Sequence, residues 1–156
     1  MAVAFTREED YEAQAANLPD RPISTHPNLV TASGLAAIEQ ALAEAREAYS
    51  NARSAGDIST DRTPMARATR DLRYWSARRA TAQLSQPEPV AGQVQFGRTV
   101  EVERDDGRRQ TFRIVGEDEA DPAAGRISPL ARALVGATVG DVVSVAGGEV
   151  EVIGVS

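Results

Sequence analysis

Carboxylates gather at two places in this chain where they could hold a metal ion or contact a partner. The first is the segment 56–61, Gly-Asp-Ile-Ser-Thr-Asp, between two stretches of helical periodicity. The second is the run 117–119, Glu-Asp-Glu, with Asp121 close behind. Magnesium prefers anionic oxygens, so Asp57 and Asp61 are the candidate metal ligands. From the residues alone we favour the alternative that both acids serve the turn and the start of the next helix.

The acidic run 117–119 is more typical of a solvated loop than of a metal site, and Asp121-Pro122 has simple turn chemistry. His26 is the only histidine and lies in a proline-rich segment without a nearby nucleophile. The sequence contains neither a phosphate-binding glycine loop nor a nucleophile motif. We therefore expect no enzymatic activity of the chain's own and no resident cofactor.

Two stretches of helical periodicity position the first acidic segment. Apolar residues recur at alternating spacings of three and four from Leu35 to Ala52, and again from Met65 to Ala82. The second stretch opens with Thr63-Pro64, a cap followed by proline at the first helical position. Two stripes joined by a short turn predict an antiparallel helical hairpin, with Trp75 in its core.

Arginines crowd the second of these helices, and helical spacing places Arg67, Arg70 and Arg78 near one side. Arginine carries a planar fork that suits carboxylates, phosphates and RNA. This side is therefore either a surface that faces RNA or a solvated face paired with glutamates of the first helix. Exposed ion pairs contribute only about 0–1 kcal/mol each, so stability alone does not require so many arginines.

The second half of the chain has the pattern of an antiparallel sheet with one short helix. Residues 99–103 alternate apolar and polar side chains, Asp106-Gly107 offers a tight turn, and residues 110–115 form the returning strand. A second strand pair is expected around Gly147-Gly148. Between the pairs, Ser128 and Pro129 cap a helix that Gly136 ends. This order of elements predicts an α+β fold.

Composition limits the classes of function. The chain has 156 residues, no cysteine and a net charge of −6, which argues against general affinity for duplex DNA and favours a protein partner. No apolar run approaches the ~20 residues of a membrane helix, and acidic residues 8–10 stand where a secretory signal would be basic. We expect a cytoplasmic monomer that does not associate with membranes.

The segments V-G-E-D-E-A-D (115–121), I-S-P-L-A-R-A-L-V-G (127–136) and V-G-D-V-V (139–143), with V-Q-F-G at 94–97, resemble the C-terminal domain of the Gre family of transcription elongation factors, GreA and GreB among them. The resemblance is specific over 92–145, looser over the hairpin, and does not include residues 1–28. It implies an FKBP-like C-terminal domain and binding to RNA polymerase at its secondary channel. It also implies that Asp121, Ser128 and Pro129 contact the polymerase, and that Arg67, Arg70 and Arg78 face RNA.

In that family two acidic residues at the hairpin tip hold a catalytic Mg²⁺ ion shared with the polymerase, which then cleaves backtracked RNA. Asp57 matches the first acid, but Thr60 stands where the family has glutamate, and Asp61 follows one position later. A threonine hydroxyl is neutral and a weak ligand. The first helix is also shorter than in cleaving members, by about two turns of 5.4 Å each. We therefore expect weak or no stimulation of RNA cleavage.

The sequence thus predicts an extended N-terminal arm (1–29), an antiparallel coiled-coil hairpin (30–85), a linker (86–91) and an FKBP-like C-terminal domain (92–156). The function we expect is regulation of transcription elongation through occupancy of the polymerase's secondary channel. One alternative is an active cleavage factor that holds Mg²⁺ with Asp57 and Asp61. Another is an adaptor for a different protein, and a weaker one is a regulator of nucleoside diphosphate kinase, known from related proteins with a shortened hairpin.

Overall fold

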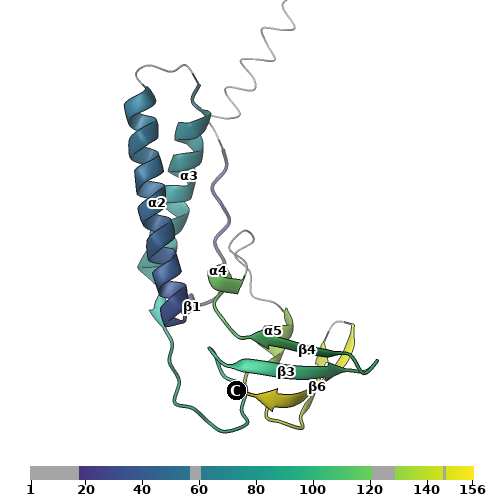
Figure 1. Cartoon of the computed structure of the whole chain (residues 1–156). Helices are drawn as coiled ribbons and strands as arrows, with labels where there is room; N and C mark the ends of the chain where they lie inside the picture. The colour runs from purple at the N-terminus through teal and green to yellow at the C-terminus, as the bar shows by residue number, and fades with distance from the viewer. Residues whose placement is uncertain (1–17, 57–60, 121–128, 146) are drawn as a thin grey trace, which may run out of the picture. The chain divides into compact units, whose positions relative to one another are not determined.

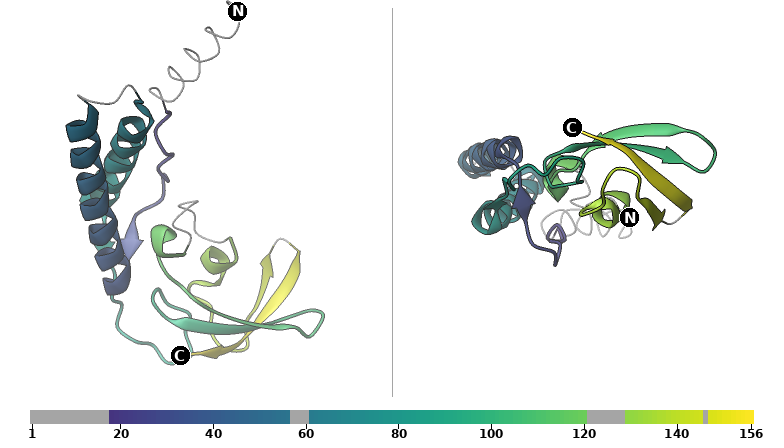
Figure 2. Two further views of the ribbon diagram at one scale, coloured as in Figure 1. Left: turned by 45° about the horizontal axis from the view of Figure 1, so that its top comes forward. Right: turned by 90° about the horizontal axis from the view of Figure 1, so that it is seen from below.

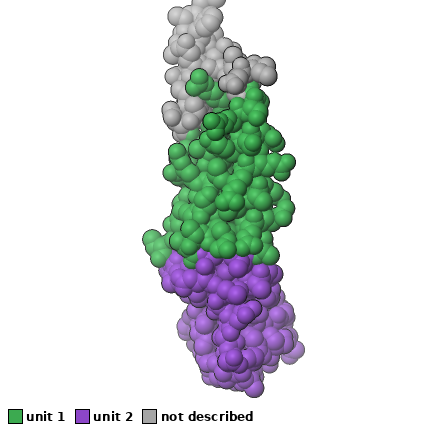
Figure 3. All heavy atoms as spheres, turned by 90° about the vertical axis from the view of Figure 1, so that its left-hand side faces the viewer, with its two compact units in different colours: residues 1–25, 36–81 green, residues 26–35, 82–156 purple. Residues whose placement is uncertain are grey.

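The computed structural model describes residues 18–56, 61–120, 129–145 and 147–156. Their elements follow in the order β1 (Leu29–Val30), α2 (Ala32–Gly56), α3 (Thr63–Thr81), β2 (Gln83–Leu84), β3 (Thr99–Arg104), β4 (Arg109–Arg113), α4 (Glu117–Ala120), α5 (Pro129–Leu134), β5 (Val142–Val145) and β6 (Gly148–Val155) (Figure 1). They form two compact units, coloured separately in Figure 3. The hairpin unit contains 18–25 and 36–81, and the sheet unit contains 26–35 and 82–156. The predicted α+β class is confirmed.

In the hairpin unit, α2 and α3 lie side by side and run in opposite directions (Figures 1 and 2). The predicted apolar stripe of α2 is buried, with Ile38, Leu42 and Ala45 at 6 % exposure or less. An ion pair also joins the helices, because Arg79 Nε lies 3.1 Å from Glu39 Oε1. The predicted antiparallel hairpin is therefore confirmed.

The buried face of α3 differs from the predicted stripe. Tyr74 and Arg78 are buried together with Ala68, whereas Trp75, predicted to lie in the core, is only half-buried. The reason is a third segment that the periodicity does not reveal. Residues 18–25 lie against α3, where the Arg21 guanidinium stands 3.7 Å from the centre of the Tyr74 ring. A second face of α3 is therefore covered.

The sheet unit is built on a four-stranded antiparallel sheet in the order β4-β3-β6-β5 (Figure 2). Both strand pairs expected from the sequence are present, and β3 also pairs with β6 so that the two pairs form one sheet. The core lies between this sheet and α5, where Val94, Val100, Val102, Ile114, Ala131, Leu134, Val150 and Val152 are buried. Alternating apolar residues on β3 and β6 therefore supply one wall of the core.

Helix α5 begins at Pro129, as predicted, and ends before Gly136, whose φ of +92° only glycine adopts readily. The Gly136 amide donates to the Val94 carbonyl at 2.9 Å, which fixes the end of α5 to the segment that precedes β3. The Asp106-Gly107 turn between β3 and β4 likewise has a positive φ, +82° at Gly107. Local sequence chemistry thus determines both chain reversals.

A short parallel pair, β1 with β2, lies at the base of the hairpin but within the sheet unit. The Gln83 amide donates to the Asn28 carbonyl and the Ser85 amide to the Val30 carbonyl, both at 2.9 Å. Thr31 follows β1 and caps α2, because its Oγ1 accepts the Gly34 amide at 3.0 Å. Two chain segments far apart in sequence therefore meet where α2 begins.

Candidate partner-binding site

The acidic run is not the solvated loop that the sequence predicted. It forms the single-turn helix α4, and Glu117 and Asp118 are only 4 % and 6 % exposed. The turn closes when the Ala120 amide donates to the Gly116 carbonyl at 2.9 Å. The run follows the buried residues Ile114 and Val115, so the chain is still inside the unit when the acids begin. The prediction was wrong because it considered the charge of the run but not the buried residues that precede it.

Glu119 ties α4 to the start of α2. Its carboxylate accepts hydrogen bonds from Thr31 Oγ1 at 2.5 Å and Ser33 Oγ at 2.7 Å, and Arg113 Nη1 lies 3.9 Å away. Helix α2 has no acidic residue in its own first turn. Glu119 therefore supplies the negative charge that the N-terminus of a long helix favours. We call the contacts of Glu119 with Thr31 and Ser33 the Glu119 latch.

Gly116 allows β1 to approach α4 closely. A Cβ atom at this position would stand 2.4 Å from the Leu29 carbonyl oxygen, much closer than such atoms come in real structures. Since the obstacle is backbone, no side-chain rotation could relieve the contact. The glycine in the V-G-E-D segment is thus required by packing, a role that the sequence analysis did not assign to it.

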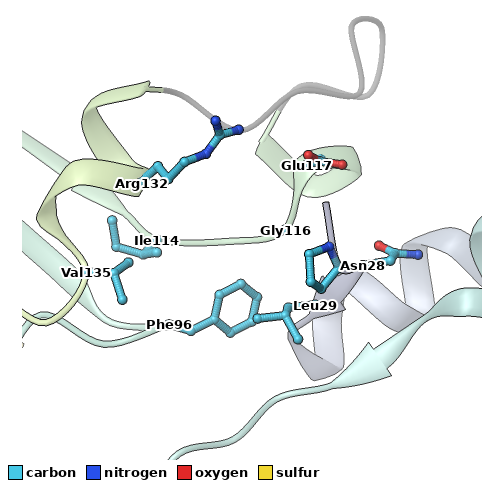
Figure 4. A pocket seen from close by; sticks show the side chains of 9 residues that line it. Asn28, Leu29, Phe96, Ile114, Gly116, Glu117, Arg132 and Val135 are labelled. Carbon is cyan, nitrogen blue, oxygen red and sulfur yellow. The ribbon is translucent and has the colours of Figure 1, made fainter. Parts of the chain in front are cut away.

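A pocket of about 350 Å³ lies in the sheet unit (Figure 4). Its lining is mostly apolar and consists of Pro27, Asn28, Leu29, Phe96, Ile114, Gly116, Glu117, Arg132 and Val135. Figure 4 shows Arg132 reaching from α5 above the apolar side chains Phe96, Ile114 and Val135. An apolar hollow with a charged rim has the character of a binding site for a protein segment. Neither Phe96 nor Arg132 was singled out by sequence reasoning as a site residue.

Of the three residues predicted to contact the polymerase, Pro129 begins α5, next to the pocket residue Arg132 on the same helix. Asp121 and Ser128 lie outside the described residues. All three assignments stay predictions.

At the hairpin tip, Asp57 and Thr60 lie outside the described residues, whereas Asp61 precedes α3. Its Oδ1 accepts the Thr63 amide at 3.0 Å, and this bond, with the Thr63 side chain and Arg67 adding smaller effects, lowers the pKa of the Asp61 carboxyl. That arrangement serves the helix start, the role favoured in the sequence analysis. Within the described ranges, no three acidic or histidine side chains are grouped so that they could hold a metal ion.

The three arginines predicted to face RNA are in different surroundings. Arg67 is exposed, and Arg70 is half-buried with its Nε 3.2 Å from Asp71 Oδ1. Arg78 is only 2 % exposed, so it does not belong to an open basic face. Its expected exposure was wrong because helical spacing places a residue on a side of the helix but does not say what covers that side.

Comparisons with known proteins identify the family of the chain. A family model described as "Transcription elongation factor, GreA/GreB, C-term" matches residues 88–156. GreA of Methylobacterium nodulans is 33 % identical over 150 residues, which span 81 % of this chain and 95 % of that protein. GreA of Desulfovibrio desulfuricans is 42 % identical over 114 residues, 69 % of each chain. GreB of Neisseria meningitidis serogroup B is 43 % identical over 91 residues, 55 % of this chain and 56 % of that one.

The chain combines a helical hairpin unit with an antiparallel sheet unit and is therefore a two-part α+β protein. The chain belongs to the GreA/GreB family of transcription elongation factors. A crystal structure of GreA factor homolog 1 (Gfh1) of Thermus thermophilus aligns with 84 % of this chain and 99 % of its own, with 21 % identity and a TM-score of 0.35. Among the helices of the described ranges, none has both the length and the apolar character that crossing a bilayer requires.

Proposed function

We propose that this chain regulates transcription elongation by binding RNA polymerase through its sheet unit, with the hairpin unit in or near the secondary channel. The observation that carries the proposal is the pocket of the sheet unit, because most of its lining residues lie in the part of the chain that matches the GreA/GreB family model. In the sequence, the predicted contact residues Asp121 and Ser128 stand between α4 and α5, and Pro129 is the first residue of α5. Glu117 of α4 and Arg132 of α5 both line the pocket.

The character of the pocket suits an interface with a protein better than one with a small cofactor. Leu29 and Val135 are large apolar residues that are 38 % and 52 % exposed, and they line the same pocket as Arg132. Apolar residues in the centre and arginine at the edge are enriched in protein interfaces. The partner surface that fits is an apolar side chain flanked by a carboxylate.

We further propose that stimulation of RNA cleavage is weak or absent. The acid of the tip that the structure describes, Asp61, already accepts the Thr63 amide, and Thr60 offers only a neutral hydroxyl. The hairpin would then act by occupying the channel. An active cleavage factor remains the alternative, and incubation of backtracked complexes with wild type and Asp57→Ala separates the two. RNA shortened by wild type and not by Asp57→Ala would contradict our proposal.

The binding proposal is tested by measuring the affinity of immobilised bacterial core RNA polymerase for the full-length chain. Arg132→Ala and Ser128→Glu are expected to weaken binding at least fivefold, because they alter the pocket rim and the neighbouring segment. Arg108→Ala is the matched control, since Arg108 is an exposed arginine of the sheet unit at the β3–β4 turn. Absence of wild-type binding would favour the adaptor alternative, and equal binding by all variants would mean that the pocket is not the contact surface.

A further inference from the structure

The inference concerns residues 18–25, which we call the strap, and the face of α3 on which they lie (Figures 1 and 2). Arg21 is the central contact, 3.7 Å above the Tyr74 ring and 5.4 Å from the Trp75 ring. Its Nη1 also lies 4.0 Å from Asp71 Oδ1. One residue earlier, Asp20 Oδ1 is 3.2 Å from Arg73 Nη1. The strap is thus attached to α3 by the ion pairs of Asp20 and Arg21 and by the stacking of the Arg21 guanidinium on the Tyr74 ring.

The α3 surface around the strap has the composition of a site for single-stranded nucleic acid. Arg67, Arg70 and Arg73 are spaced along it, and Tyr74 and Trp75 meet edge to face with ring centroids 4.9 Å apart. Proteins bind single strands by stacking bases on aromatic rings while arginines neutralise the phosphates. The Arg21 guanidinium is itself planar and lies where a stacked base would lie, so the strap and a base cannot occupy the Tyr74 face together.

We propose that the strap is an intramolecular cover that competes with single-stranded RNA for the Tyr74 face of α3. This inference rests on the proposed function, because it is the proposed position in the channel that would bring the hairpin to RNA. It adds a regulation that the function does not require. In the covered state, Tyr74 is only 3 % exposed and Arg73 is paired with Asp20, whereas release of the strap makes both available to RNA.

The contacts that hold the strap are of a kind that a ligand can displace. In the pair between Arg73 and Asp20 the side chains are 67 % and 63 % exposed, so solvent screens their attraction. Arg21 is more deeply placed, with 22 % of its side chain exposed, and its guanidinium stacks on the Tyr74 ring. Loss of this contact is expected to raise the affinity for RNA about threefold to tenfold, the range that a partly exposed cation–π contact corresponds to.

The test uses the full-length chain and two variants. Fluorescence anisotropy with a labelled oligouridine measures RNA affinity, and Trp75, the only tryptophan, reports release of the strap through its emission. Arg21→Ala is expected to change the emission and to tighten RNA binding. The direction of the change in RNA affinity is diagnostic, because removal of a positive charge by itself weakens the attraction to phosphates. Arg108→Ala, which removes an exposed positive charge from the sheet unit, should leave the emission unchanged and should not tighten binding.

Three results would overturn the proposal. Unchanged Trp75 emission in Arg21→Ala would mean that Arg21 does not hold the strap. Changed emission with equal or weaker RNA binding would mean that the strap covers no RNA site, and absence of RNA binding by both proteins would have the same meaning. Each of these leaves the proposed function standing if the wild type binds polymerase in the separate affinity measurement. Circular dichroism of Arg21→Ala verifies that the helices remain folded.

Discussion

Replacement of Gly116 by alanine tests the arrangement at the base of the hairpin most directly. The added Cβ would stand 2.4 Å from the Leu29 carbonyl oxygen, whereas real Cβ atoms essentially never approach within 3.0 Å. The Leu29 peptide must therefore retreat by more than half an ångström. Since Leu29 lies in β1, this movement disturbs the pairing of β1 with β2.

The cost can be worked from the contacts that would be disturbed. At least two backbone hydrogen bonds hold β1 to the β2 segment, those of the Gln83 and Ser85 amides, and each contributes about 1 kcal/mol net. Overpacking of an ordered site costs about 1–3 kcal/mol. Alanine recovers about 0.5 kcal/mol by restricting the unfolded chain. We therefore expect Gly116→Ala to lower the free energy of unfolding by about 2.5–4.5 kcal/mol.

Urea denaturation followed by circular dichroism measures this change, and amide hydrogen exchange at Gln83 and Ser85 shows whether the β1–β2 pair is the part that loosens. Gly154→Ala is the control, because its Cβ would meet nothing closer than 3.7 Å. Equal stability of the two variants, with unchanged exchange at both amides, would refute the reasoning.

Three further predictions concern other contacts. Glu119→Ala should lower the free energy of unfolding by about 1–3 kcal/mol in urea titrations, because two hydroxyl donors lose a charged acceptor. An unchanged free energy of unfolding would mean that the Glu119 latch does not stabilise the fold. Leu134→Ala should cost about 2–5 kcal/mol, since Leu134 is fully buried, whereas Val135→Ala, at a site 52 % exposed, should cost less than 1 kcal/mol in the same assay. The hydrogen bond from the Thr63 amide lowers the pKa of Asp61 below 3.8. This bond therefore stabilises the folded chain above pH 3.8, and the stabilisation is lost as the pH falls through the lowered pKa. An NMR titration of the Thr63 amide with a midpoint at or above pH 3.8 would contradict this prediction.

Local sequence chemistry predicted the elements with repetitive patterns. The α2 stripe from Ile38 to Ala45, the β3 alternation, and the start of α5 at Pro129 with its end before Gly136 each depend on neighbouring residues, and each is present as expected. The sequence therefore predicted the two long helices, the four strands of the sheet and α5 in their order along the chain. The helix pair and the sheet were predictable because their periodicity is sustained over several residues.

What the sequence did not predict depends on partners distant in the chain. Tyr74 is buried in place of Trp75 because Arg21 stacks on it, and no periodicity within α3 encodes that contact. Glu117 is buried because it continues a buried segment that begins at Ile114, although three consecutive acids indicate a solvated loop. Strands β1 and β2 have two residues each, too few for an alternating pattern. The site in the sheet unit was therefore only partly visible in the sequence.

The pairing of β1 with β2 also has a consequence for how the length of the α2–α3 hairpin can vary. One strand immediately precedes the first long helix and the other immediately follows the second, so the chain leaves the sheet unit and re-enters it through adjacent, hydrogen-bonded strands. Matched insertions of whole turns in α2 and α3 would leave these anchoring strands and the Glu119 latch untouched. The length of the hairpin can therefore be changed in paired whole-turn increments without rebuilding the sheet unit.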